Sequence, residues 1–201
     1  MNGDPAEAAP FIDKWRERWP EWAIAQVFLP MLQRPVAEAW FAMVQEWTDA
    51  ATTAEPAPGL AKLAWWQEEL RGWGKGARRH PLGAALQRHP LEWDDLADAL
   101  PALARRGHPA GDGSLDALPR RLSQAEQILF GEARDGEASI RNALRHALNT
   151  GDALEGDRDG TRPRRLLAGL QAARAASGNA PLPPWRTLAC SWRSARAGMR
   201  G

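Results

Sequence analysis

The segment from Pro35 to about Ala51 has apolar residues at steps of three and four positions. They are Val36, Trp40, Met43, Val44 and Trp47. An α-helix brings residues three and four apart to one face, so this spacing predicts a helix with one buried side. After Pro58 and Gly59 the same spacing returns with Leu63, Trp66, Leu70 and Trp73. The alternating pattern of a half-buried strand is absent, and we therefore predict an all-α protein.

Pro and Gly divide the rest of the chain into further helical segments. We expect helices over 11–19, 35–51, 60–73, 80–89, 93–106, 118–134, 137–150, 164–178 and 182–201, with a polar loop at 151–163 and Gly151 at a helix end. A length of 201 residues suits one domain better than two. The sequence predicts a compact single-domain helical bundle over residues 1–201.

The charge balance excludes steering by an overall electric field. Lys and Arg number 26 against 25 Asp and Glu, which gives a net charge of +1, although the last forty residues are basic. We therefore expect no nucleic-acid partner. The single Cys190 cannot form an internal disulfide, the N-terminus lacks the pattern of a signal peptide, and no apolar run is long enough to span a bilayer. These features predict a cytoplasmic protein without a transmembrane segment.

The aromatic composition is unusual, with 11 Trp and no Tyr. Trp has a large apolar body and one hydrogen-bond donor. Such residues either fill the core between helices or line an apolar cleft, and both arrangements produce the same helical stripes.

Two further patterns have a functional and a structural interpretation. His80, His89 and His108 each precede Pro, but their spacing favours helix starts over metal ligation. The motif "DDLAD" places Asp94, Asp95 and Asp98 within one helical turn, where carboxylates can converge on Mg²⁺. Its structural interpretation is a helix start, with Asp94 as the N-cap and Asp95 at the positive end of the helix dipole.

Two blocks of sequence resemble the squalene/phytoene synthase family. In "FLPMLQRPVAEAWFAMVQEWTDAAT" the matching positions are Phe28, Leu29, Pro30, Arg34, Ala39, Phe41 and Ala42. The block "LAKLAWWQEELRGWGKGARRHPLGAAL" is similar to the family's next helix and loop, with paired Trp before His-Pro. The resemblance covers residues 20–86, and it implies the all-α isoprenoid synthase fold, in which two Asp-rich motifs hold Mg²⁺ while two prenyl diphosphates are joined.

The chain departs from that family at its metal and diphosphate motifs. The outer carboxylates of the first motif fall on Thr48 and Thr52, so that only Asp49 keeps an acid. A neutral hydroxyl is a poor ligand for Mg²⁺. Where the family often has Ser-Arg-Ser-Phe, this chain has "WPEW", with Glu21 in place of a basic donor. The second motif falls on 144–160, with Gly156 and Gly160 at the metal positions.

Three hypotheses follow from the resemblance and its departures. In the first, the protein is catalytically degenerate, uses no cofactor, and binds an isoprenoid or lipid chain or a protein partner. Its candidate ligand-binding residues are Arg34, Trp40, Trp47, Trp66 and Arg78. In the second, it is an Mg²⁺-dependent prenyl-diphosphate transferase of the head-to-head type. Its candidate metal ligands are Asp49, Asp94, Asp95 and Asp98, with Arg34 or Arg78 on the diphosphate. In the third, the likeness is a chance pattern, which predicts no cavity between the helices.

Overall fold

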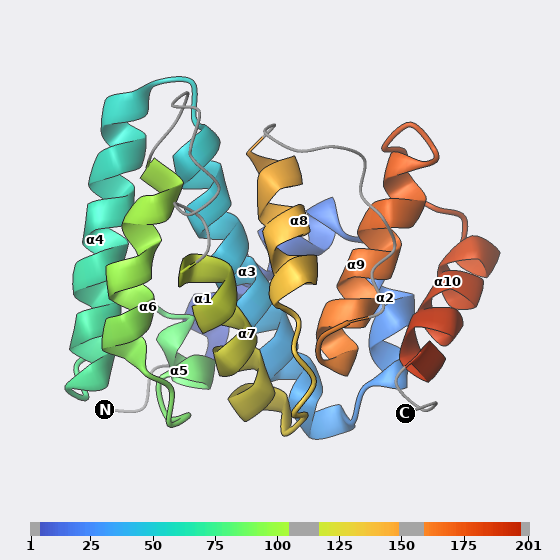
Figure 1. Cartoon of the computed structure of the whole chain (residues 1–201), viewed down its shortest axis with the longest axis horizontal. Helices are drawn as coiled ribbons and strands as arrows, with labels where there is room; N and C mark the ends of the chain where they lie inside the picture. The colour runs from blue at the N-terminus through green and yellow to red at the C-terminus, as the bar shows by residue number, and fades with distance from the viewer. Residues whose placement is uncertain (1–4, 105–116, 149–158, 198–201) are drawn as a thin grey trace.

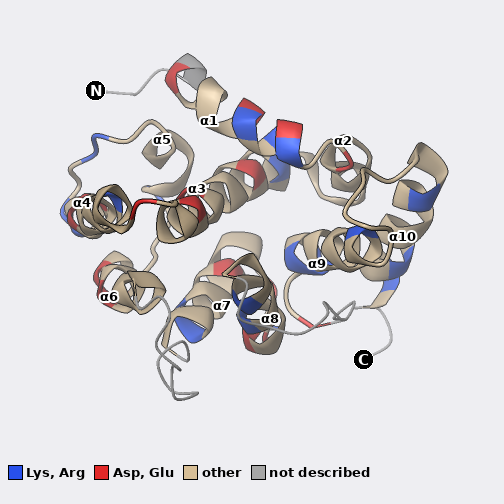
Figure 2. Ribbon diagram, turned by 90° about the horizontal axis from the view of Figure 1, so that it is seen from above, with Lys and Arg blue, Asp and Glu red and all other residues tan. Residues whose placement is uncertain are grey.

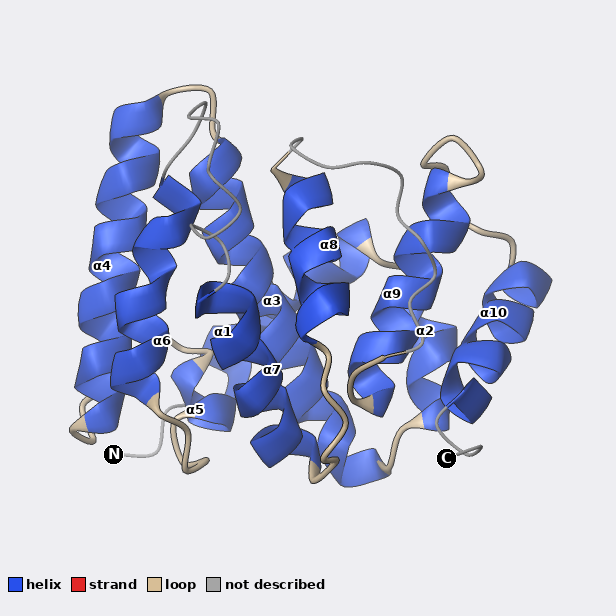
Figure 3. Ribbon diagram, in the orientation of Figure 1, coloured by secondary structure: helices blue, strands red, loops and turns tan. Residues whose placement is uncertain are grey.

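The protein is helical throughout the part of the chain that the structure describes. This computed structural model describes residues 5–104, 117–148 and 159–197, and none of them lies in a β-strand (Figure 3). The α-helices are α1 (Pro5–Arg18), α2 (Trp22–Ala25), α3 (Arg34–Thr52), α4 (Pro56–Gly74), α5 (Gly83–Leu86), α6 (Trp93–Ala99), α7 (Ala117–Phe130), α8 (Glu137–Ala147), α9 (Arg162–Ala175) and α10 (Pro184–Arg196). Short 3₁₀ turns are η1 (Gln26–Phe28), η2 (Met31–Gln33) and η3 (Leu100–Ala104). The all-α prediction is confirmed.

Helix α3 is the centre of the arrangement (Figure 1). Helix α1 crosses one side of it, while α7 and α8 lie on the other side (Figure 2). Helices α4 and α6 pack together at one end of the molecule, and α9 and α10 pack together at the other end beside α2. Almost every residue in the first half of α3 is buried, because this helix has neighbours on all sides.

Proline begins the longer helices, and this explains most of the predicted boundaries. Helices α3, α4, α9 and α10 each have Pro at the first or second position, where the missing N–H costs no hydrogen bond. The predicted end of α3 is confirmed to within one residue. Several predicted boundaries were wrong. Helix α1 begins at Pro5 and includes Pro10, α4 begins at Pro56, α5 covers only Gly83–Leu86, α7 ends at Phe130, and residues 93–104 are divided into α6 and η3. The predicted helix end at Gly151 lies outside the described residues.

The Trp residues mostly fill the core. Seven of the 11 are buried, at positions 15, 22, 40, 47, 66, 73 and 93. Trp47, Trp66, Trp73 and Trp93 form a chain of edge-to-face ring contacts with centroids 4.8–6.3 Å apart. His80 lies 4.4 Å from Trp66, and burial lowers the pKa of its imidazole to about 4. The core interpretation of the stripes on α3 and α4 is therefore correct.

None of the described helices combines the length and the apolar character that crossing a bilayer requires, in agreement with the sequence prediction.

Candidate functional site

A pocket of about 120 Å³ lies between α1, α3, α8 and α9. Each helix contributes residues at steps of three and four positions, so each presents one face to the pocket. The apolar lining comes from Trp15, Trp19, Phe41, Val44, Ile140, Ala143, Leu144, Ala147 and Leu167. The polar lining comes from Arg18, Gln45, Thr48, Arg164 and Gln171. The site is therefore an apolar pocket with a few polar groups, as is typical of small-molecule sites.

The side-chain amide oxygens of two pocket residues lack a hydrogen-bond donor. The side-chain oxygens of Gln45 and Gln171 are both buried and accept no hydrogen bond in the structure. Gln45 is only 8% exposed, so bulk water does not solvate its amide freely. An unsatisfied buried acceptor costs free energy, of the order of 1–3 kcal/mol. A bound hydroxyl group would donate its one hydrogen to one of these two oxygens and so remove the cost there.

One wall of the pocket is held by a buried ion pair. Arg164 and Glu126 are both almost inaccessible to solvent, and the guanidinium Nε of Arg164 donates to both carboxylate oxygens of Glu126 at 3.1 Å. The indole Nε1 of Trp40 donates to the same carboxylate at 2.8 Å. The guanidinium also lies over the ring of Phe41, 5.0 Å from its centroid. These contacts join α3, α7 and α9 around the pocket.

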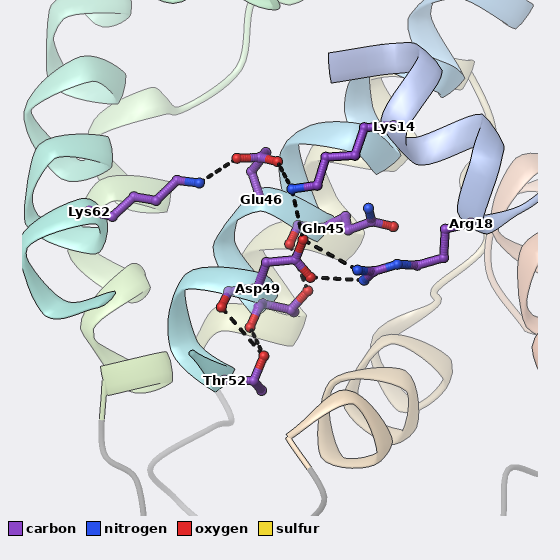
Figure 4. A network of polar contacts seen from close by, with 8 residues as sticks. Lys14, Arg18, Gln45, Glu46, Asp49, Thr52 and Lys62 are labelled. Carbon is purple, nitrogen blue, oxygen red and sulfur yellow. Dashed lines mark hydrogen bonds and ion pairs between the residues drawn. The ribbon is translucent and has the colours of Figure 1, made fainter. Parts of the chain in front are cut away.

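The acidic residues near the C-terminal end of α3 are paired with cations of the protein itself. Lys14 and Arg18 reach from α1, and Lys62 reaches from α4, toward Glu46 and Asp49 (Figure 4). The ammonium of Lys14 lies 2.7 Å from Glu46 and 3.1 Å from Asp49, and the guanidinium of Arg18 lies 2.8 Å from Asp49. We call these five residues the α3 ion cluster.

The α3 ion cluster has three positive and two negative charges. Burial alone would raise the pKa of Glu46, but hydrogen bonds from Lys14 and Lys62 outweigh this effect and hold the pKa below its ordinary value. The pKa of Lys14 is raised, because its hydrogen bonds to Glu46 and Asp49 outweigh its own desolvation. Both groups therefore stay charged at neutral pH. A divalent cation would have to displace protein cations from these carboxylates.

The candidate carboxylates of α6 do not join Asp49. Asp95 pairs with Arg121 of α7 at 2.8 Å, and Asp98 pairs with Arg71 of α4 at 2.9 Å. Asp94 is exposed near the end of α4. Helices α1 and α6 lie on opposite sides of α3 and α4, so the two acidic sets face different parts of the molecule (Figure 2). Among the described residues no three His, Cys, Asp or Glu side chains are grouped to hold a metal ion.

The N-terminal turn of α6 differs in detail from its structural interpretation. Glu92 occupies the N-cap position and makes no side-chain cap, while Asp94 and Asp95 both lie in the first turn. The predicted N-cap at Asp94 was wrong, because the helix begins at Trp93. Both carboxylates are nevertheless at the positive end of the helix dipole.

None of the five candidate ligand-binding residues lines the pocket. Arg34 donates to the backbone carbonyls of Leu29 and Val27 and so closes the turns before α3. Trp40, as described above, donates to Glu126. Trp47 and Trp66 contact each other in the core, with ring centroids 5.9 Å apart.

The fifth candidate, Arg78, has its aliphatic stem beside Gly83. A Cβ at Gly83 would lie 2.6 Å from this stem, which explains the absence of a side chain there. A ligand contact by any of the five residues stays an untested prediction.

Glu21, at the position of the expected diphosphate motif, is buried and used structurally. Its carboxylate accepts hydrogen bonds from Arg174 at 2.7 Å and from the backbone N–H of Leu182 at 2.7 Å. Burial opposes ionisation, but these bonds lower its pKa below the ordinary value. Glu21 therefore anchors the connection between α9 and α10.

The sequence reasoning missed the cations of the α3 ion cluster and the amides of the pocket. Lys14 and Arg18 are four residues apart, and Glu46 and Asp49 are three apart, so each pair lies on one helical face. This charge complementarity between two predicted helices was a usable signal. Gln171 and Arg164 gave no such signal, because a single polar residue on a helix has no distinguishing pattern.

Cys190, the single cysteine of the chain, is not an activated nucleophile. Cys190 is buried, and burial raises the pKa of its thiol. Its thiol donates to the backbone carbonyl of Gly169 at 3.2 Å. A neutral thiol without a neighbouring base is a poor nucleophile.

Comparison of the chain with protein families, with curated proteins and with solved structures finds no match. The resemblance to the squalene/phytoene synthase family therefore stays a prediction, and so does a transferase activity.

Proposed function

We propose that the protein is a non-catalytic binding protein on a squalene/phytoene-synthase-like helical scaffold. Its ligand is an isoprenoid or another lipid chain with a hydroxyl group, and the pocket between α1, α3, α8 and α9 holds one end of that ligand. The observation that supports this proposal is the composition of the pocket. Faces of four helices surround it with nine apolar and five polar residues, and two buried amide oxygens, of Gln45 and Gln171, lack donors.

The size of the pocket sets the part of the ligand that it can hold. An apolar cavity of about 150 Å³ accommodates a benzene molecule. The volume here is about 120 Å³, which is smaller than that cavity, so the pocket as it stands holds only the hydroxyl-bearing tip of an isoprenoid chain. Sites for whole drug-sized ligands are about 300–1,000 Å³. The remaining chain of a longer isoprenoid must therefore extend outside the pocket or widen it.

The α3 ion cluster favours binding over prenyl transfer. Transfer of a prenyl group requires metal ions that neutralise the diphosphate leaving group. The acids at this end of α3 are Glu46 and Asp49, and both already pair with Lys14, Arg18 or Lys62. A hydroxyl group carries no charge and needs no metal. A neutral isoprenoid alcohol therefore fits the polar groups of the pocket better than a prenyl diphosphate.

Filling the pocket tests the proposal. Ala143 of α8 lines the pocket, whereas Ala138 lies exposed on the same helix. Farnesol is titrated into the protein and its two variants while the intrinsic Trp fluorescence is followed, to which Trp15 and Trp19 of the pocket lining contribute. We expect saturable binding by the native chain and by Ala138→Phe, and a loss of about tenfold or more in Ala143→Phe, because the new ring occupies the ligand volume.

Two outcomes would overturn the proposal. If Ala143→Phe and Ala138→Phe bound farnesol with equal affinity, the ligand would bind outside the pocket. If the native chain did not respond to farnesol, the pocket would not be an isoprenoid site. In the second case the same scaffold would have to act through a protein partner. Circular dichroism of both variants verifies that each is folded.

A further inference from the structure

Helix α10 buries its small side chains and exposes its large apolar ones. Thr187, Cys190 and Ser191 face the interior. The exposed fractions of Trp185, Leu188 and Trp192 are 71%, 50% and 50%. This is the reverse of an ordinary surface helix, which turns its apolar stripe toward the core.

The reversal has a cause in the packing of α10 on α9. A Cβ at Gly169 of α9 would lie 2.3 Å from Oγ of Ser194 and 3.4 Å from Sγ of Cys190. The two helices are therefore too close for large residues between them. Small residues at 187, 190, 191 and 194 permit this approach, and the Trp side chains are left outside.

The exposed residues form a continuous stripe. Trp185, Leu188 and Trp192 follow at steps of three and four, so they share one helical face. The guanidinium of Arg196 lies over the ring of Trp192, 4.5 Å from its centroid. We call these four residues the α10 stripe. Helix α10 itself lies at the outer end of the molecule, away from α3 (Figure 1).

The charged residues of α10 itself are all positive. Helix α10 contains Arg186, Arg193 and Arg196 and no acidic residue (Figure 2). None of the ion pairs within residues 5–104, 117–148 and 159–197 involves these three arginines. The net charge of the chain is only +1, so the protein as a whole is not attracted to an anionic surface. The local positive charge of α10 attracts this helix in particular to such a surface.

We infer that α10 docks on the surface of an anionic lipid bilayer. Trp side chains favour the boundary between headgroups and acyl chains, and Arg side chains beside them pair with anionic headgroups. The α10 stripe supplies both on one exposed face, and the helix lies parallel to the surface in this arrangement. The inference does not depend on the ligand of the pocket, because α10 contributes no residue to the pocket lining.

Vesicle co-sedimentation of the full chain tests the inference. The probes are vesicles of phosphatidylcholine with phosphatidylserine, and vesicles of phosphatidylcholine alone, at low and high salt. We expect binding to the anionic vesicles that weakens at high salt, and weak binding to the neutral ones. The inference would be overturned if the protein bound neither type of vesicle, or if its binding depended on neither the lipid charge nor the salt concentration.

Matched variants locate the contact. Trp185→Ser with Trp192→Ser should reduce binding by about tenfold or more, because the apolar part of the contact is lost. Leu60→Ser with Ile128→Ser removes exposed apolar residues of α4 and α7 and should leave binding unchanged. Equal loss in both double variants would refute the assignment to α10.

Single charge reversals provide a second comparison. Arg193→Glu should weaken binding. Arg88 is also exposed but is distant from α10 in the sequence, so Arg88→Glu should leave binding unchanged. The pocket variant Ala143→Phe should bind vesicles like the native chain, which separates this inference from the proposed function. If sedimentation velocity instead shows a dimer that Trp185→Ser with Trp192→Ser dissociates, the α10 stripe is an interface between two chains and the membrane inference is wrong.

Discussion

Replacing Glu126 by Leu should destabilise the protein more than any change of an exposed charge. Glu126 is 1% exposed and accepts hydrogen bonds from Trp40 and Arg164. Its removal leaves the guanidinium of Arg164, itself 3% exposed, without a counter-charge. Breaking a buried ion pair in this way costs about 3–5 kcal/mol. We expect a loss of about 4 kcal/mol, a large part of the roughly 5–15 kcal/mol that stabilises a typical domain.

Urea unfolding, followed by circular dichroism and Trp fluorescence, measures this loss. With a slope of about 2 kcal/mol per molar urea, the midpoint should fall by about 2 M. The control is Asp98→Asn, which removes the exposed partner of Arg71 and should change stability by less than about 1 kcal/mol.

A double variant separates the ion pair from packing. Glu126→Leu combined with Arg164→Met removes both charges and should recover most of the stability, because apolar pairs often replace buried ion pairs without loss. A loss in Glu126→Leu no larger than in Asp98→Asn would refute the reasoning. It would mean that water reaches Arg164 through the pocket and solvates the guanidinium.

Two further predictions concern stability. The pKa of His80 is about 4 in the folded protein and about 6.5 in an unfolded chain. As the pH falls, the unfolded state therefore binds the proton first, and unfolding should become easier by about 2 kcal/mol between about pH 6.5 and 5. His80→Gln should flatten this part of the stability profile measured by urea unfolding. An unaltered profile in His80→Gln would contradict the assignment. Gly59→Ala should cost about 1–3 kcal/mol in thermal unfolding, because its Cβ would lie 2.2 Å from the carbonyl oxygen of Ala50. Gly72→Ala on the same helix meets nothing closer than 3.4 Å and should be neutral or stabilising, so an equal loss in both variants would be the contrary result.

The centre of the fold could be predicted from the sequence because α3 and α4 carry long, regular apolar stripes. Val36, Trp40 and Trp47 repeat at helical spacing, and Pro and Gly mark the ends of the pattern. The start of α1 at Pro5 could not be predicted, because the segment before Phe11 has little apolar pattern and because Pro10, which lies inside the helix, is a residue that normally breaks one.

The candidate site was harder to predict, because it depends on which helical faces meet. A stripe such as Trp40, Trp47 and Trp66 shows that a face is buried and does not distinguish a core from a pocket. Lys14 and Glu46 are 32 residues apart, and their contact depends on how α1 crosses α3. Such contacts come from tertiary packing, which local spacing does not contain.

Helix α10 is a second case in which the spacing of residues along the sequence does not determine the tertiary packing. Its Trp residues have the spacing of a buried face, yet they point outward, because the small residues on the opposite face pack on Gly169 of α9. The spacing predicts that the apolar residues share one face of the helix, but it does not predict whether that face points to the core or to solvent. The burial of neighbouring small residues decides which side of the helix is inside.

The most direct test of the account compares farnesol with farnesyl diphosphate in Trp fluorescence titrations, each with and without Mg²⁺. The account predicts saturable binding of farnesol that Mg²⁺ does not change, because the pocket offers Gln45 and Gln171 as acceptors and the acids of the α3 ion cluster are already paired. Tighter binding of the diphosphate that requires Mg²⁺ would contradict it. That result would show that a metal–diphosphate site exists and that the protein belongs with the prenyl transferases.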